Sequence, residues 1–167
     1  MRLPKGLTVA TIILVAVIVQ TTFFGQIDII TPDLVLLVAI LLALTRIRPE
    51  LVLGVGFAAG LVVDLLSPSL TGLRAVVFTI VAYMALRTRE RASIGRPAMA
   101  LWAGVLTFVG VLLVVVVGTL FGQTNLLGSD VGLRLLIVPI GNIFVAGLLA
   151  PIFVRLVDGD TTAFRFS

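Results

Sequence analysis

The chain has 167 residues, of which 60% are hydrophobic and only 12% are charged, and its mean hydropathy is +1.27. A soluble domain of this length carries about twice that charged fraction, so the composition predicts an integral membrane protein. Cysteine and histidine are both absent, which excludes disulfides, thiol chemistry, the common zinc sites and a histidine base. The 12 basic residues flank apolar runs, which favours a role in membrane topology over binding to nucleic acid.

Six apolar segments follow one another along the chain. They cover residues 7–24, 32–45, 51–66, 71–86, 99–121 and 131–157. We therefore expect a single all-α membrane domain over residues 1–167, built as a bundle of six transmembrane helices. The second to fourth segments are short for a membrane core of about 30 Å, so they either borrow flanking residues or lie in a locally thinned bilayer.

An alternative topology joins the second and third segments into one re-entrant hairpin. The stretch TRIRPE between them carries two arginines and a proline. Those residues are typical of a solvated turn, so we expect two separate helices.

The basic residues orient the predicted bundle. If the N-terminus lies inside, ten of the twelve lysines and arginines fall on the inner side, and only Arg74 and Arg134 fall on the outer side. The positive-inside rule therefore predicts that both termini are cytoplasmic. The first segment has a basic start like that of a signal peptide, but no small-residue cleavage site follows, so we expect it to remain as the first membrane helix.

The third segment carries two glycines and an acid at helical spacing. Gly56, Gly60 and Asp64 are four residues apart and share one helix face. The glycines would let a neighbouring helix approach closely, in this bundle or in a partner, and the aspartate indicates that this face is buried in protein. We expect Asp64 and Arg74 to lie near the outer boundary, on either side of LSPSLTG. Two interpretations stay open, a structural ion pair and a polar contact for a ligand or partner protein.

The second segment begins with a typical helix start. Thr31 can cap the helix, Pro32 suits its first turn, and Asp33 lies at the positive end of the helix dipole. Capping explains all three residues without a further function.

A basic stretch, RTRERASIGR, follows the fourth segment. It contains Arg87, Arg89, Arg91 and Arg96. We expect these arginines to anchor the cytoplasmic end of the helix to anionic lipid headgroups, and docking of a cytoplasmic protein is the alternative.

The sixth segment combines small residues with an amide. Asn142, Ala146 and Ala150 repeat at four-residue spacing and form a small, partly polar stripe. We interpret the stripe as a packing face, with a binding groove as the alternative. Pro139 and Pro151 are expected to bend this helix.

The arrangements that catalysis requires are missing from the sequence. We find no phosphate-binding glycine loop, no nucleophile beside a base and no pair of carboxylates deep in the bundle, because Asp64 is the one acid expected within the membrane. We therefore predict a protein that is not an enzyme and that binds no metal or cofactor.

Several of these features occur together over residues 31–89, about a third of the chain. They are Pro32-Asp33 at the start of the second helix, the glycine-spaced third helix ending in Asp64-Leu65-Leu66-Ser67, and then Leu70, Gly72 and Tyr83. In this order and spacing they resemble the MreD family of rod shape-determining membrane proteins. Pro68 stands where the family usually has a small residue, most often glycine.

The resemblance implies a scaffold subunit of the bacterial cell-elongation machinery, multi-pass in the inner membrane, that helps to organise peptidoglycan synthesis. It implies binding to MreC, a single-span protein with a large extracytoplasmic domain, beside RodA and a penicillin-binding protein. Association of two copies stays open.

The resemblance also implies a bundle similar to the substrate-binding subunits of energy-coupling-factor vitamin transporters. This likeness supplies an alternative function, the substrate-binding subunit of a small-molecule transporter. Such subunits carry an alanine-x-x-x-alanine patch on their first helix, whereas here Ala10 and Ala16 are six residues apart.

Overall fold

Every regular element of the described chain is helical. The computed structural model describes residues 5–24, 32–67, 70–92, 95–123, 128 and 130–158. The six predicted helices are present among these residues. They are α1 (Lys5–Val19), extended by a π-helical turn η1 (Gln20–Phe24), then α2 (Leu34–Leu44), α3 (Pro49–Leu66), α4 (Leu73–Ala92), α5 (Arg96–Leu120) and α6 (Val131–Asp158).

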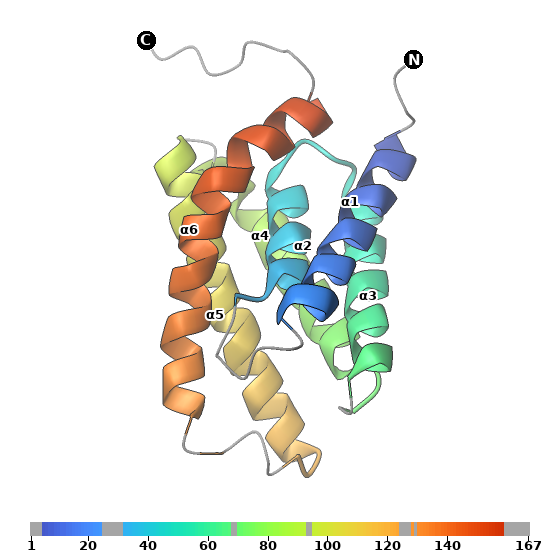
Figure 1. Cartoon of the computed structure of the whole chain (residues 1–167). Coiled ribbons are helices and arrows are strands. Elements are labelled where there is room, and N and C mark those ends of the chain that lie inside the picture. The colour runs from blue at the N-terminus through green and yellow to red at the C-terminus, as the bar shows by residue number, and fades with distance from the viewer. Residues whose placement is uncertain are drawn as a thin grey trace.

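The shortest helix, α2, lies at the centre of the bundle (Figure 1). It contacts each of the other five helices, and its residues from Val35 to Leu44 are all buried. A helix that is apolar on every side is stable only where other elements cover it completely, and the sequence of α2 contains no polar residue. The core of the molecule is therefore built around α2.

The position of α2 changes the explanation for its short length. Its 11 residues span about 16 Å, which is less than the membrane core of about 30 Å. From the sequence we expected that flanking residues lengthen this segment or that the bilayer is locally thinned. The structure instead shows a short helix that its neighbours enclose. In the described part of the chain, three helical stretches are long and apolar enough to cross a membrane, namely Pro49–Leu66, Pro97–Leu120 and Val131–Val154.

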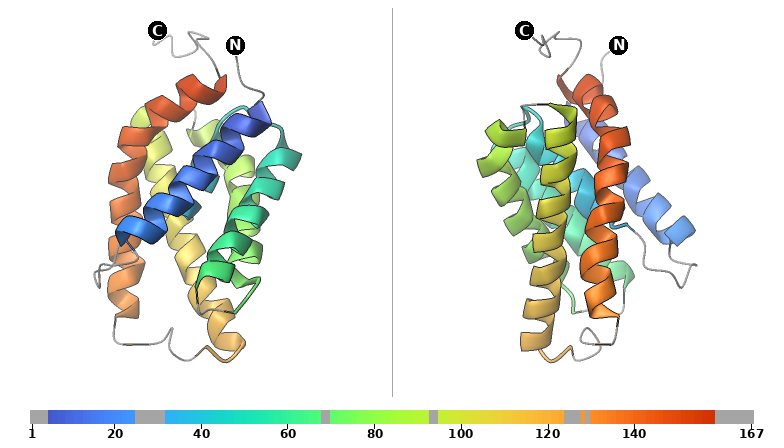
Figure 2. Two further views of the ribbon diagram at one scale, coloured as in Figure 1. Left: turned by 45° about the vertical axis from the view of Figure 1, so that its right-hand side comes forward. Right: turned by 90° about the vertical axis from the view of Figure 1, so that its left-hand side faces the viewer.

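The other helices surround α2 in pairs. The α3 helix packs along α4, and α5 packs along α6, while α1 lies obliquely across the bundle (Figure 2). The N-terminal end of α1 and the C-terminal end of α6 lie at the same end of the bundle (Figures 1 and 2). That arrangement agrees with an even number of passes, and the side of the membrane on which this end lies remains a prediction.

The α4 helix is longer than the sequence predicted. We expected it to end near Leu86, but it continues to Ala92 and carries Arg87, Arg89 and Arg91 on its last turns. Arginine is a good helix former, and cations are favourable near a helix C-terminus, so the basic stretch extends the helix instead of ending it. This extension brings Arg89 alongside the end of α2.

Candidate functional site

The glycine face of α3 packs against α4. A Cβ placed on Gly60 would lie 2.5 Å from the carbonyl oxygen of Arg74 and 2.6 Å from the Cα of Ala75. A Cβ on Gly56 would lie 3.3 Å from the carbonyl oxygen of Phe78. At Gly60 only a residue without a side chain allows the two backbones to approach this closely, whereas at Gly56 an added Cβ would require a shift of a few tenths of an ångström. The sequence left open whether this face serves the bundle or a partner, and the structure uses it inside the bundle.

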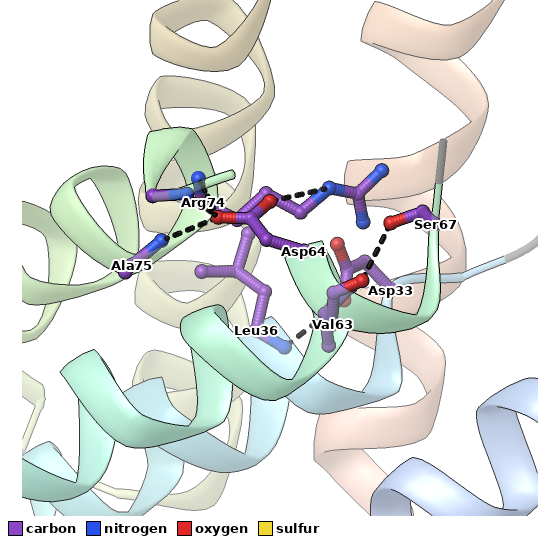
Figure 3. Close-up of polar contacts among 8 residues, drawn as sticks. Asp33, Leu36, Val63, Asp64, Ser67, Arg74 and Ala75 are labelled. Atoms are coloured by element: carbon purple, nitrogen blue, oxygen red, sulfur yellow. Dashed lines mark hydrogen bonds and ion pairs between the residues drawn. The ribbon is translucent and has the colours of Figure 1, made fainter. Parts of the chain in front are cut away.

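The Asp64 carboxylate caps the N-terminus of α4. It is 1% exposed, and its Oδ2 accepts hydrogen bonds from the backbone N–H groups of Gly72 and Arg74, both at 2.9 Å, and of Ala75 at 3.3 Å (Figure 3). The first N–H groups of a helix have no partner within it, and Gly72 has no side chain that could cap them. Asp64 of α3 therefore acts as the N-terminal cap of α4, a role that a residue next to the helix usually fills.

The Arg74 guanidinium adds a weaker interaction. Its Nε lies 3.9 Å from Asp64 Oδ1, and the side chain is 30% exposed. The predicted pair is therefore present, but the contact is longer than the three backbone hydrogen bonds. The carboxylate is tolerated in an apolar helix chiefly because backbone N–H groups and the positive end of the α4 dipole surround it.

A second polar cluster lies at the N-terminal end of α2. Asp33 is the N-cap, and its Oδ1 accepts from the N–H of Leu36 at 3.0 Å. Pro32 packs against α6, where a Cβ on Gly141 would lie 2.8 Å from the proline ring. Thr31, the third residue of the predicted helix start, lies outside the described residues.

Two buried polar side chains from α5 and α6 reach the same helix end. The Nδ2 of Asn142 donates to the Asp33 carbonyl at 3.2 Å and to Thr107 Oγ1 at 3.0 Å, and neither side chain is exposed. From η1, the π-helical turn that follows α1, Gln20 Oε1 accepts the N–H of Leu34 at 2.7 Å. We refer to Gln20, Asp33, Thr107 and Asn142 together as the central polar cluster.

The depth of the central polar cluster differs from the prediction. Thr107 lies near the middle of α5, and Asn142 lies near the middle of α6. Because Asn142 bonds the Asp33 carbonyl, the start of α2 lies level with the middle of the two longest helices. The sequence placed only Asp64 within the membrane, whereas in the structure Asp33 also lies level with the middle of these long helices; the membrane depth of both residues stays a prediction. Hydropathy along a single segment does not show how deeply the segment begins in the bundle.

Arg89 caps the other end of α2. Its Nε donates to the Ala43 carbonyl at 3.0 Å, and its Nη2 donates to the Ile47 carbonyl at 3.2 Å. The last carbonyls of a helix lack partners within it, so this arginine satisfies acceptors that would otherwise be unpaired. Sequence reasoning grouped Arg89 with the lipid anchors, whereas the structure directs its guanidinium into the protein.

The other arginines of the basic stretch are arranged differently. Arg87 lies over the ring of Tyr83, 5.3 Å from its centroid, and donates from Nε to the tyrosine hydroxyl at 2.9 Å. Arg91 is exposed, as the lipid-anchor interpretation requires. The side chain of Arg96 lies outside the described residues. Lipid anchoring by this stretch thus remains a prediction.

The chemistry available at these sites is that of hydrogen bonding and charge. Among the described residues, no group of three or more acidic side chains lies close enough together to hold a metal ion. The capping groups of Asp64 and Arg89 are used to fix helix ends. The sequence did not single out Gln20 or Thr107, because each is an ordinary polar residue in an apolar helix whose partner is far away in the chain.

Comparison with known proteins identifies one family. A family model described as "rod shape-determining protein MreD" matches residues 2–158. No curated protein sequence and no solved structure matches the chain.

Proposed function

Because the chain belongs to the MreD family of rod shape-determining proteins, we propose that it is a non-enzymatic scaffold subunit of the bacterial cell-elongation machinery. In this role it lies in the cytoplasmic membrane with both termini inside, binds an MreC-like single-span protein, and helps to organise peptidoglycan synthesis by RodA and a penicillin-binding protein. The observation that carries the proposal is the family match over nearly the whole chain.

The arrangement of polar groups supports a scaffold. Asp64 holds the start of α4, and Arg89 holds the end of α2. Gly60 lets α3 and α4 touch through their backbones. Contacts of this kind fix the relative positions of helices, which is what a subunit that positions other membrane proteins needs.

The apolar surface offers room for partners and lipid. Large exposed apolar side chains occur along α5 and α6, among them Leu120, Leu136, Phe144 and Leu148. In a membrane such side chains face lipid or another membrane-spanning helix. Association with MreC, with the synthase or with a second copy of the chain would use part of this surface.

A pull-down tests the proposal against a transporter subunit. The tagged chain is purified from its own host in mild detergent, and the bound proteins are identified by mass spectrometry. We expect a single-span protein with a large extracytoplasmic domain, with or without the elongation synthase. Recovery of a second membrane subunit together with ATPases, and no such single-span protein, would refute the scaffold and indicate a transporter.

A further inference from the structure

The exposed face of α4 changes from apolar to aromatic to basic along the helix. The apolar side chains of Val76 and Ile80 are exposed on this face, and Tyr83 follows them at helical spacing with 47% of its surface exposed. Arg87 and Arg91, both exposed, continue the face toward the end of the helix. Tyrosine is enriched where the apolar core of a membrane meets the lipid headgroups. This order therefore places Arg87 at the level of the headgroups.

Tyr83 and Arg87 act as one unit. The Arg87 guanidinium lies over the tyrosine ring, 5.3 Å from its centroid, and its Nε donates to the tyrosine hydroxyl at 2.9 Å. The two residues are four positions apart on the helix, so the ring holds the guanidinium from the adjacent turn. A long surface side chain usually loses freedom when it binds a ligand, and this contact already restricts Arg87.

The donors of this pair are available to a ligand. Within the described residues, the O–H of Tyr83 has no acceptor, and the two Nη groups of Arg87 make no hydrogen bond. Arg91, one turn further along, adds a second positive charge, which the exposed carboxylate of Glu90 offsets in part. A set of donors with net positive charge fits an anion, and phosphate oxygens match the geometry of a guanidinium group.

The surface next to the pair distinguishes between sources of phosphate. The exposed side chains of Val76, Ile80 and Met84 lie on the same face of α4, on the side away from the arginines. An acyl chain can pack along them while a phosphate lies at Tyr83 and Arg87. Burial of apolar surface thus favours a lipid over a phosphate ion from solution. The site lies at the end of the bundle where α1 begins and α6 ends, which is the predicted cytoplasmic end (Figure 1).

We propose that Tyr83 and Arg87 form a binding site for the phosphate of an anionic phospholipid, whose acyl chain packs on the apolar side chains of the same face. The sequence predicted a general attraction of four arginines to headgroups. The structure instead turns Arg89 into the protein and leaves Arg87 on the surface, held by a tyrosine. The inference does not depend on the proposed function, since a lipid site requires no partner protein.

Tyr83 reports on the site directly, because it is the one tyrosine of the chain. The full chain is labelled with ring-¹³C tyrosine and purified in a mild non-ionic detergent. Its single tyrosine NMR signal is followed while phosphatidylglycerol, phosphatidylcholine or inorganic phosphate is added. We expect phosphatidylglycerol to shift the signal saturably and phosphatidylcholine to bind at least about fivefold more weakly, as loss of net negative charge predicts. Inorganic phosphate at the same concentration should leave the signal unchanged.

Three variants separate a built site from general charge attraction. Arg87→Gln should weaken binding of phosphatidylglycerol about tenfold, through loss of a charge-assisted hydrogen bond. Arg87→Lys keeps the charge but not the planar guanidinium, and should weaken binding about threefold. Arg48→Gln is the matched control, because Arg48 is exposed at the same end of the bundle, next to the Ile47 carbonyl that Arg89 binds. It should alter binding by less than about twofold.

The following outcomes would overturn the inference. Equal weakening by Arg87→Gln and Arg48→Gln would indicate general charge attraction without a site. Equal binding of phosphatidylglycerol and phosphatidylcholine would show that the negative charge is not recognised. The same shift with inorganic phosphate would assign the site to a free anion. If Arg87→Gln lowers the thermal unfolding midpoint of the chain, Arg87→Lys decides the question, and wild-type affinity of that variant would count against the site.

The lipid titration is independent of the scaffold pull-down. Failure of the pull-down would remove the proposed function and leave the lipid site intact. An unchanged tyrosine signal with phosphatidylglycerol would remove the lipid site and leave the scaffold function intact.

Discussion

Gly60→Ala tests the close packing of α3 against α4. The added Cβ would lie 2.5 Å from the Arg74 carbonyl oxygen, whereas ordinary Cβ contacts begin at 3.4 Å. The obstacle is backbone, which cannot rotate away as a side chain could. The two helices must therefore separate locally by about 0.9 Å.

The separation also weakens the cap on α4. Asp64 accepts N–H groups of Gly72 and Arg74 at 2.9 Å, and a shift of nearly one ångström takes these distances beyond hydrogen-bonding range. Overpacking costs about 1–3 kcal/mol, and weakening hydrogen bonds to a charged group costs about 1.5–3 kcal/mol. The higher helix propensity of alanine offsets about 1 kcal/mol of this destabilisation. We expect a net destabilisation of about 2–4 kcal/mol.

Thermal unfolding in mild detergent measures this effect. Gly54→Ala is the matched control, because it makes the same change in the same helix where no atom lies within 4 Å of the added Cβ. We expect Gly60→Ala to lower the midpoint by roughly 5–10 °C and Gly54→Ala to leave it unchanged or raise it slightly. Equal midpoints for the two variants would refute the close-packing argument.

Three further predictions concern the helix ends, each checked by the same unfolding measurement. Asp64→Asn keeps an acceptor and should lower the free energy of unfolding by about 1–2 kcal/mol. Asp64→Ala leaves three N–H groups unpaired and should lower it by at least about 3 kcal/mol. Equal effects of the two substitutions would contradict the capping role. Arg89→Met removes the bonds to the Ala43 carbonyl in α2 and to the Ile47 carbonyl in the turn after it, and should cost about 1–3 kcal/mol, while Arg91→Met, at an exposed position, should be nearly neutral. Gln20→Leu leaves the Leu34 N–H without its acceptor and should cost about 1–2 kcal/mol, and an unchanged midpoint would show that another group replaces it.

The helices could be predicted from the sequence because apolar segments alternate with arginine- and proline-containing turns. The TRIRPE stretch lies between two separate helices, α2 and α3, as expected; that it is a solvated turn stays a prediction. The face shared by Gly56, Gly60 and Asp64 also follows from helical spacing, and the structure packs this face against α4. These features depend on residues that are close together in the chain, so they can be predicted from the sequence alone.

The depth and the distant partners of α2 could not be predicted. Hydropathy cannot distinguish a helix in contact with lipid from one covered by five other helices, since both are apolar on every side. The bonds of Arg89 to Ala43 and of Asn142 to Asp33 join residues 46 and 109 positions apart. No local pattern specifies such pairs, so Asp33 was interpreted as a helix cap alone.

The most direct test of the scaffold role is cell shape after depletion of the chain from its own host. The gene is placed under a repressible promoter, and cell width and length are followed by microscopy as the protein disappears. We predict that the cells lose their rod shape and become round, and that re-expression of the wild-type chain restores rods. Cells that keep a normal width and rod shape after complete depletion would contradict the account.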